Sequence, residues 1–222
     1  MIRVAILISG RGSNMQALAD TFDTSADISI CLVVANKPCV GIENATACGI
    51  PTKIVNRSDY DSREDHDRAM RVILDDVEPD YILLAGYMAI LGAAFVAHFA
   101  PRILNIHPSL LPAYKGLDTH ERALADGAKR HGATVHIVSE QLDDGPVILQ
   151  AALDVKPEDT AKTLAARVLI LEHLLYPFIL SSLAHGNLEI TGSDAIWHNG
   201  QAALDRHGDT ARAQLEPALI WP

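Results

Sequence analysis

The chain has 222 residues, of which 49% are hydrophobic and 21% charged, and this composition excludes disordered, collagen-like and low-complexity fibrous proteins. Twenty-eight acidic residues against eighteen basic ones give a net charge of −10, so we expect the surface to repel nucleic acids and anionic membranes. The three cysteines show no CxxC spacing, and the ten histidines form no HxxxH or HExxH pattern. A disulfide framework, a structural zinc site and any other metal site are therefore not expected.

Neither a targeting segment nor a membrane span is expected. The first apolar run, at residues 4–8, is far shorter than the core of a signal peptide and leads directly into a Gly-Arg-Gly sequence. No apolar run is expected to approach the ~20 residues that a span requires. Together with the unpaired cysteines, this predicts a cytoplasmic protein.

Apolar runs alternate with amphipathic segments through the first half of the chain. The pattern predicts strands at residues 4–8, 30–34, 53–55, 81–85 and 103–107, and helices at 14–22, 41–48, 62–77 and 91–98. Strands that are apolar on both faces and separated by helices indicate a parallel sheet covered on both sides. The expected fold is therefore α/β, with a doubly wound, mainly parallel sheet and helices on both faces.

The second half of the chain has a different pattern. It predicts a helix at residues 119–126, strands at 134–138 and 147–151, a long helix at 160–184 and short strands near 188–190 and 195–197. The short connection at 139–146, which contains a glycine, suggests an antiparallel addition in the C-terminal half. No boundary divides residues 1–200 clearly into two domains, and residues 201–222 are left unassigned.

The segment 9–14, SGRGSN, lies between the first predicted strand and the first predicted helix. Its glycines permit a tight turn, Ser13 is expected to cap the helix, and the backbone N–H groups of a helix start attract phosphate. The segment lacks the third glycine of GxGxxG and the GK[ST] of a P-loop. An ordinary turn is the alternative, but the position at the carboxyl end of a parallel strand favours a binding role.

Asn105 and His107 are two residues apart on a predicted strand, so their side chains lie on the same face. Pro108 ends that strand and places the pair at its carboxyl edge. An amide beside an imidazole can polarise a carbonyl group and deliver a proton. The alternative is two polar residues satisfied at a strand end.

Three further features each allow a structural and a functional interpretation. The run 143–146, DDGP, is typical of a turn, and a catalytic role requires one carboxylate to fold back onto His107, where it would favour the imidazolium form. Residues 88–91 line a pocket or belong to the core. Glu172 makes a polar contact at a cleft or lies on a solvated helix face. Arg63 is most simply a residue of a charged helix start.

With these segments assembled, the chain resembles the phosphoribosylglycinamide formyltransferases of the folate-dependent formyltransferase superfamily over residues 2–197. The segments that carry the resemblance are 8–14 (ISGRGSN), 84–88 (LAGYM), 104–112 (LNIHPSLLP) and 142–148 (LDDGPVI). The asparagine-histidine-aspartate set is shared by the wider superfamily. The Gly-x-Gly-Ser-Asn loop and the proline after the histidine are typical of the glycinamide branch.

The resemblance implies transfer of the formyl group of 10-formyltetrahydrofolate to the amine of N1-(5-phosphoribosyl)glycinamide, in de novo purine biosynthesis. Asn105 and His107 would stabilise the tetrahedral intermediate, and Asp143 would tune His107. No metal is implied, and the expected partners are small-molecule substrates, with neither nucleic acid nor membrane. The oligomeric state, monomer or homodimer, stays open.

The resemblance also implies which residues bind each substrate and which half of the chain holds each site. The glycinamide ribonucleotide site would comprise Gly12, Ser13, Asn14 and Glu172, and the folate site Arg63, Met88, Ala89, Ile90, Leu91 and Asn105. Residues 1–200 would form a single formyltransferase domain, with a nucleotide-binding half at 1–100 and a catalytic and folate-binding half at 101–200. The peptide bond between Leu111 and Pro112 would be cis.

Four positions depart from the family pattern. Asp118 stands where the family usually has histidine, which would alter a secondary polar contact near the substrate, and Asp144 stands where glycine is usual. Lys115 and Ala89 also differ from the common residues. None of these departures removes a principal catalytic group.

Three other functions compete with the transferase. A hydrolase of the same superfamily deformylates 10-formyltetrahydrofolate but carries an additional N-terminal domain, for which a first strand at residue 2 or 3 is expected to leave no room. A methionyl-tRNA formyltransferase would need a further C-terminal domain and a surface that tolerates RNA. A non-catalytic nucleotide-binding module would not bring Asn105, His107 and Asp143 together.

Overall fold

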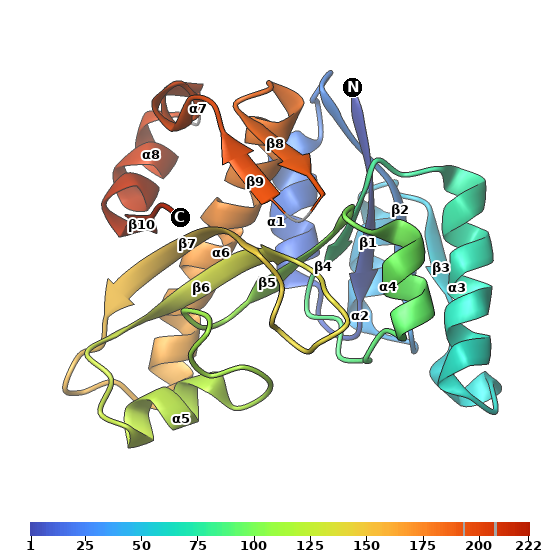
Figure 1. The fold of residues 1–222 in the computed structure, drawn as a ribbon, viewed down its shortest axis with the longest axis horizontal. Coiled ribbons are helices and arrows are strands. Elements are labelled where there is room, and N and C mark those ends of the chain that lie inside the picture. The colour runs from blue at the N-terminus through green and yellow to red at the C-terminus, as the bar shows by residue number, and fades with distance from the viewer. Residues whose placement is uncertain (193, 207) are drawn as a thin grey trace. The chain divides into compact units, whose positions relative to one another are not determined.

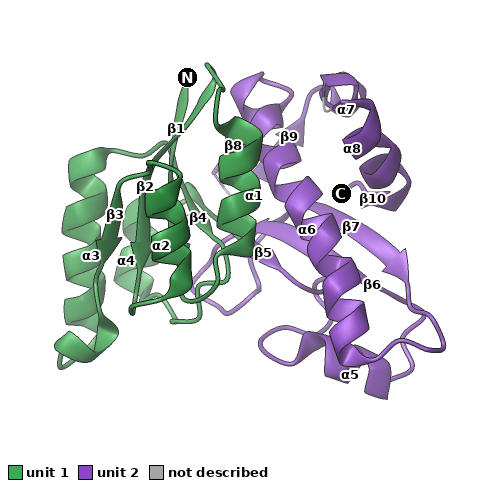
Figure 2. Ribbon diagram, turned by 180° about the vertical axis from the view of Figure 1, so that it is seen from behind, with its two compact units in different colours: residues 1–105 green, residues 106–222 purple. Residues whose placement is uncertain are grey.

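A computed structural model describes residues 1–192, 194–206 and 208–222. The chain divides into two compact units, residues 1–105 and residues 106–222 (Figure 2). Each unit has its own sheet strands and helices, described in turn below (Figure 1).

The first unit is a parallel α/β structure. Its elements are β1 (Ile2–Ile8), α1 (Ser13–Phe22), β2 (Ile28–Ala35), α2 (Val40–Ala47), β3 (Thr52–Ile54), a short 3₁₀ helix (Arg57–Asp59), α3 (Arg63–Val77), β4 (Tyr81–Leu84), α4 (Ala93–Phe99) and β5 (Ile103–His107), whose last two residues belong to the second unit. β1 pairs in parallel with β2 and β4, β2 pairs with β3, and β4 pairs with β5. This confirms the mainly parallel sheet that the first half of the sequence predicts.

Burial explains this arrangement. Residues 4–8 of β1 are fully buried, so helices must cover both faces of the strand. In this unit α1 packs against α2, and α3 packs against α4. The predicted helix at 62–77 begins one residue later than expected because Ser62 is its N-cap, and the Ser62 hydroxyl accepts a hydrogen bond from the N–H of Asp65 at 3.1 Å.

The second unit holds an antiparallel pair and a long central helix. Its elements are α5 (Thr119–Ala125), β6 (Arg130–Ile137), β7 (Val147–Asp154), α6 (Ala161–Ala184), β8 (Leu188–Thr191), β9 (Asp194–Trp197), α7 (Gly200–Arg206), α8 (Asp209–Leu215), a short 3₁₀ helix (Glu216–Ala218) and β10 (Leu219–Ile220). β6 and β7 are antiparallel, as predicted, and α6 packs on both strands. The short strands β8 and β9 form a separate antiparallel pair.

Two parts of this unit differ from the sequence-based expectation. β6 begins four residues earlier than predicted, because Gly132 lets the strand approach the carbonyl of Ala151 so closely that a side chain would clash there. Residues 201–222, which the sequence left unassigned, form α7, α8 and β10. β10 adds to the sheet by pairing antiparallel with β7, so the tail is an integral part of the unit.

Helix α6 also corrects the expectation that no apolar run approaches membrane-span length. Among the described residues it is the one helix long and apolar enough, by length and composition, to cross a membrane. However, 56% of its apolar window is buried inside the structure, and its packing on β6 and β7 is that of a core helix.

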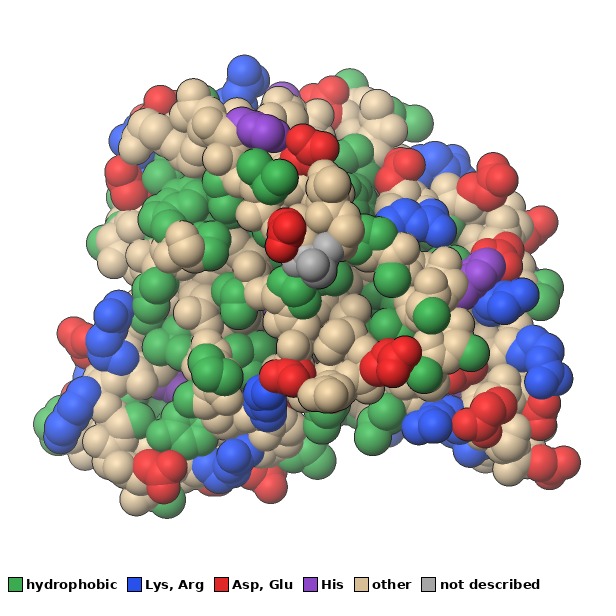
Figure 3. All heavy atoms as spheres, in the orientation of Figure 1, with side chains coloured by type: hydrophobic (Ala, Val, Ile, Leu, Met, Phe, Trp, Pro, Cys, Tyr) green, Lys and Arg blue, Asp and Glu red, His purple; other side chains and the backbone are tan. Residues whose placement is uncertain are grey.

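Acidic and basic side chains are interspersed over the molecular face shown in Figure 3.

Candidate active site

The loop between β1 and α1 is shaped by glycine. Gly12 is the N-cap of α1 with φ +70°, and a Cβ at this position would lie 3.1 Å from the Cα of Gly41. Ser13 is the first residue of the helix and does not cap it, so the predicted capping role was wrong. Because the N-cap residue is a glycine, which has no side chain, the helix begins without a side-chain cap. Asn14, one residue further, is buried.

In the first unit, two hydrogen bonds hold the loop that follows β4. The Ser9 hydroxyl, at the end of β1, accepts a hydrogen bond from the N–H of Met88 at 2.8 Å. The carboxylate of Asp67, on α3, accepts one from the N–H of Gly92 at 2.7 Å. A Cβ on Gly92 would lie 3.6 Å from the Nε of Arg63, so the loop and Arg63 are neighbours.

The four residues expected to line a pocket in this loop differ in exposure. The side chains of Met88 and Ile90 are 68% and 59% exposed, and Ala89 is half-buried. Leu91 is buried, with 8% exposure, and belongs to the core. Large exposed apolar side chains on a loop are typical of a ligand or partner contact.

His107 ends β5 and is almost completely buried. Its Nδ1 lies 3.4 Å from Oδ2 of Asp143, and its Nε2 lies 2.9 Å from the carbonyl oxygen of Tyr114. The side chains of His107 and Asp143 are only 7% and 8% exposed. Asn105 lies two residues earlier on the same strand, so its side chain leaves the same face of β5. The contact between histidine and aspartate that sequence spacing could not establish is therefore present.

Asp143, rather than Asp144, faces the histidine. Asp143 has φ +49°, and its Oδ2 also accepts a hydrogen bond from the N–H of Gly116 at 2.9 Å. Its Oδ1 lies 3.7 Å from the Nε2 of His136 on β6. Asp144 points elsewhere and forms an ion pair with Lys115. In this turn, the carboxylate of Asp143 therefore contacts the buried His107 and His136, whereas that of Asp144 contacts the partly exposed Lys115.

Three more histidines lie in this part of the second unit. The Nδ1–H of His136 donates to the carbonyl of Ile137 at 3.0 Å, and burial lowers the pKa of His136. Burial also lowers the pKa of His120, and it lowers the pKa of His131 to about 4. The rings of His120 and His131 meet at 3.1 Å between Nδ1 and Nε2. No group of three potential metal ligands occurs among the described residues.

The remaining expectations concern three positions in the second unit. Glu172, on α6, is buried with 7% exposure, which excludes a solvated helix face. The peptide bond between Leu111 and Pro112 is cis, as the family resemblance implies. Asp118 is the N-cap of α5 with φ +56°, without a side-chain cap hydrogen bond.

Sequence reasoning missed three residues that hold these groups in position: Asp67, Tyr114 and His136. It included Ser9 in the predicted binding loop but did not foresee its hydrogen bond with Met88. Ser9 and Asp67 are buried polar side chains that contact the loop after β4, and His136 contacts the second oxygen of Asp143. Their signal was weak, because a polar residue inside an apolar strand or helix is visible in sequence but its partner is not. Tyr114 acts through its backbone carbonyl and carries no sequence signal.

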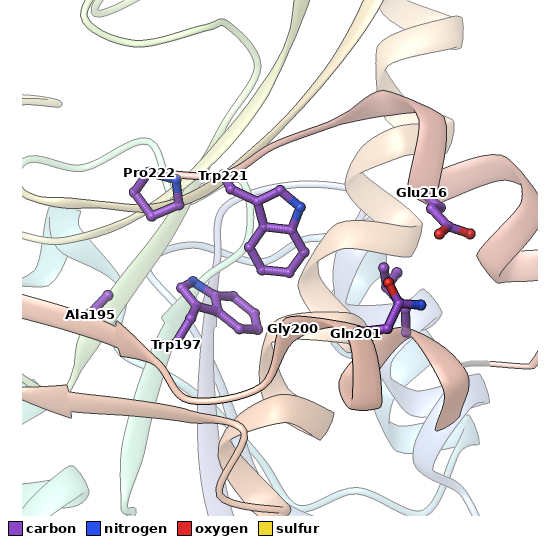
Figure 4. Close-up of a pocket in the computed structure, with 8 residues that line it drawn as sticks. Ala195, Trp197, Gly200, Gln201, Glu216, Trp221 and Pro222 are labelled. Carbon is purple, nitrogen blue, oxygen red and sulfur yellow. The ribbon is translucent and has the colours of Figure 1, made fainter.

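A groove of about 670 Å³ lies elsewhere in the second unit, at the C-terminal tail (Figure 4). Its lining includes Trp197 and Trp221, whose rings meet nearly at right angles with centroids 4.7 Å apart, together with Glu216 and Gln201. None of the predicted site residues lines it. The groove is therefore separate from the histidine-aspartate pair.

Comparison with known proteins places these features in one family. The Formyl transferase family profile matches residues 2–180. Phosphoribosylglycinamide formyltransferase of Escherichia coli is 45% identical over 202 residues, covering 90% of this chain and 95% of that protein. The human trifunctional purine biosynthetic protein adenosine-3 is 44% identical over 190 residues, which span 85% of this chain but 19% of that longer protein.

Solved structures agree with the sequence relatives. The phosphoribosylglycinamide formyltransferase of Coxiella burnetii superposes with a TM-score of 0.84 at 43% identity, covering 88% of this chain and 93% of that one. The enzyme of Brucella melitensis superposes with a TM-score of 0.79 at 47% identity, covering 86% and 98%. The chain therefore belongs to the formyl transferase family, in its phosphoribosylglycinamide formyltransferase branch.

Proposed function

We propose that this formyltransferase of purine biosynthesis takes its formyl group from 10-formyltetrahydrofolate and transfers it to the amine of N1-(5-phosphoribosyl)glycinamide. The observation that carries the proposal is the buried pair of His107 and Asp143 at the end of β5, with Asn105 on the same face of that strand. A buried acid–base pair beside an amide donor suits attack on a carbonyl carbon.

The proposed reaction begins when the neutral amine attacks the formyl carbon and forms a tetrahedral oxyanion. The Asn105 amide and the His107 imidazole are the groups that would stabilise this negative charge, and the Nε2–H of His107, which contacts the Tyr114 carbonyl in the structure, would turn to the oxyanion. The bond from the formyl carbon to the folate nitrogen then breaks. Because binding places the two substrates side by side, proximity contributes much of the acceleration.

Protons balance without a metal or a covalent enzyme intermediate. The attacking nitrogen loses one proton, and the departing folate nitrogen gains one. In the proposal, the Asp143 carboxylate orients the His107 imidazole and passes the proton through water. The 3.4 Å separation between the Asp143 and His107 side chains supports this role.

For the phosphate of the ribonucleotide, the proposed site is the start of α1. The phosphate would lie on the backbone N–H groups of Gly12, Ser13 and Asn14, because the first N–H groups of a helix lack partners within the helix and carry partial positive charge. The φ of +70° at Gly12 supports close approach of the backbone to a ligand. Glu172 would contact the region of the substrate amine.

For the folate, the proposed site comprises Arg63, Met88, Ala89, Ile90, Leu91 and Asn105. The exposed Met88 and Ile90 offer apolar contact to the pterin ring system, and Leu91 contributes its backbone. The Arg63 guanidinium, beside Gly92 and 47% exposed, suits the carboxylates of the folate glutamate.

The proposed setting is the cytoplasm, with small-molecule substrates as partners and a monomer or homodimer as the assembly. The three cysteines of the chain are free in the structure, which suits the reducing environment of the cytoplasm. Residues 1–200 are proposed to act as one formyltransferase domain, with ribonucleotide binding in 1–100 and catalysis and folate binding in 101–200.

The test uses purified protein with 10-formyltetrahydrofolate, with and without N1-(5-phosphoribosyl)glycinamide. We expect folate release to require the amine substrate, and mass spectrometry to find the formyl group on glycinamide. Equal release in both reactions would reject the transferase in favour of a folate hydrolase. A substrate analogue without the 5-phosphate should bind much more weakly, and unchanged binding would reject the phosphate site at α1.

A further inference from the structure

Two neighbouring links join the segment 114–117 to the turn at 143–144. The N–H of Gly116 donates to Oδ2 of Asp143 at 2.9 Å. One residue away on both segments, the ammonium of Lys115 forms an ion pair with Asp144. The ion pair is therefore placed to hold the same two stretches of backbone that the hydrogen bond joins.

The segment 114–117 is also held by α5. The guanidinium of Arg122 donates to the carbonyl of Lys115 at 2.6 Å and to that of Leu117 at 3.3 Å. It also lies 5.6 Å from the centre of the Tyr114 ring. Arg122, the Gly116–Asp143 hydrogen bond and the Lys115–Asp144 ion pair therefore all constrain this segment.

His107 takes one partner from each of the two joined segments. Its Nε2 contacts the carbonyl of Tyr114, and its Nδ1 contacts the carboxylate of Asp143. A shift of either segment would move a partner of the proposed proton donor. The relative position of the two segments therefore controls the orientation of the imidazole.

Both segments need such a constraint because of their backbone conformations. Tyr114 has φ +56° and Asp143 has φ +49°, a region that residues with a Cβ rarely occupy. Such conformations persist when the surrounding contacts hold them.

We propose that Lys115 and Asp144 are positioning residues, whose ion pair holds Asp143 against Nδ1 of His107 and fixes the segment 114–117 beside the imidazole. The proposal rests on the proposed function, in which His107 and Asp143 act on the substrate.

The effect of the pair is modest because its side chains are partly exposed, 35% for Lys115 and 44% for Asp144. Ion pairs of this exposure contribute little and are screened by salt. We expect Lys115→Ala and Asp144→Ala each to lower kcat by about two- to five-fold, with the KM of both substrates unchanged. The loss should shrink as the salt concentration rises.

The first experiment is a double-mutant cycle with charge reversal. The double variant should be no slower than the slower single variant, and Lys115→Glu combined with Asp144→Lys should recover at least half of the lost kcat. Arg71→Ala is the control, because Arg71 forms a similarly exposed pair with Asp75 on α3 and should leave kcat unchanged. Unchanged single variants, multiplicative losses or no recovery on charge reversal would overturn the proposal.

The second experiment does not depend on enzyme activity. It measures by NMR the hydrogen-exchange rate of the Gly116 amide, which donates to Asp143 and so reports on the contact between the two segments. Exchange should become about two- to five-fold faster in either single variant, return toward the original rate on charge reversal, and stay unchanged in Arg71→Ala. An unchanged rate in the single variants would overturn the positioning role even in an active enzyme. Absence of transferase activity in the unmodified protein would instead reject the proposed function, and the exchange rates would still decide the positioning role.

Discussion

Asp143 and Asp144 are adjacent in the chain but face different partners, and this difference predicts different effects of substitution. Asp143→Asn removes the charge beside His107 and should lower kcat by about 100-fold or more, the scale of a general acid–base contribution. Asp144→Asn weakens a partly exposed ion pair and should leave kcat within a few-fold. The measurement is kcat for both variants across a pH series, with circular dichroism to confirm folding.

The kcat values of the two variants distinguish a wrongly assigned carboxylate from a wrong proton route. Inactivity of Asp144→Asn with an active Asp143→Asn would mean that the wrong carboxylate is assigned to the histidine. Full activity of both variants would mean that the reaction uses another route for its proton.

His131 predicts a pH dependence of stability. Burial lowers its pKa in the folded protein to about 4, below the value of 6.5 for an unperturbed histidine. Between these values the unfolded chain binds more protons than the folded one, so stability decreases as the pH falls from about 6.5 toward 4. This residue should account for about 1–2 kcal/mol of the stability lost between pH 7.5 and pH 5.0.

The measurement is urea unfolding at both pH values for the unmodified protein, His131→Gln and His198→Gln. His131→Gln should lose less stability on acidification than the unmodified protein, whatever its stability at pH 7.5. The exposed His198 provides the control and should change little. Equal acid sensitivity in all three proteins would show that His131 is not the group that titrates.

At the scale of single elements, the start of α1 depends on one glycine. Gly12→Ala adds a Cβ at φ +70° that would meet Gly41, so the backbone N–H groups of the helix start must shift. We expect the KM for the ribonucleotide to rise by about ten-fold or more, because roughly 1.4 kcal/mol of lost phosphate binding corresponds to a factor of ten. The KM for the folate should stay the same.

Gly49→Ala is the matched control for backbone strain. Gly49 has nearly the same φ, +72°, but no described atom lies within 4 Å of a Cβ placed there. Both substitutions should destabilise the fold by about 1 kcal/mol, and Gly12→Ala alone should change the ribonucleotide KM. An equal rise in KM for both variants would attribute the effect to general destabilisation.

Local pattern was sufficient for most elements. The strand at 103–107 agrees with β5 residue for residue, and the long helix at 160–184 differs from α6 only because Thr160 is the N-cap. The start of β6 was missed because Gly132 interrupts the apolar pattern while its lack of a side chain is what permits the close pairing. α7 and α8 were missed because helices of seven residues contain too few turns for a periodicity to be recognised.

At the scale of the whole molecule, the two compact units divide the proposed site residues between them. Residues 1–105 contain the α1 loop, Arg63, the loop after β4 and Asn105, whereas residues 106–222 contain His107, Asp143 and Glu172. The boundary falls within β5, between Asn105 and His107. The sequence predicted one domain over residues 1–200, and the second unit extends further, because β10 pairs with β7.

The amino-acid order alone was enough to predict the α/β class, the strand carrying Asn105 and His107, the family resemblance and the glycine turn before α1. These depend on periodicity, turn residues and contiguous motifs, which are local properties of a chain. Tertiary structure decided which of two adjacent aspartates meets His107, which cation pairs with the other, and that the tail belongs to the sheet. The two outcomes at the aspartates depend on the φ of Asp143 and on partners 27 to 36 residues away in the chain, and such separations carry no directional information until the backbone has folded. The tail joins the sheet through a pairing between still more distant residues.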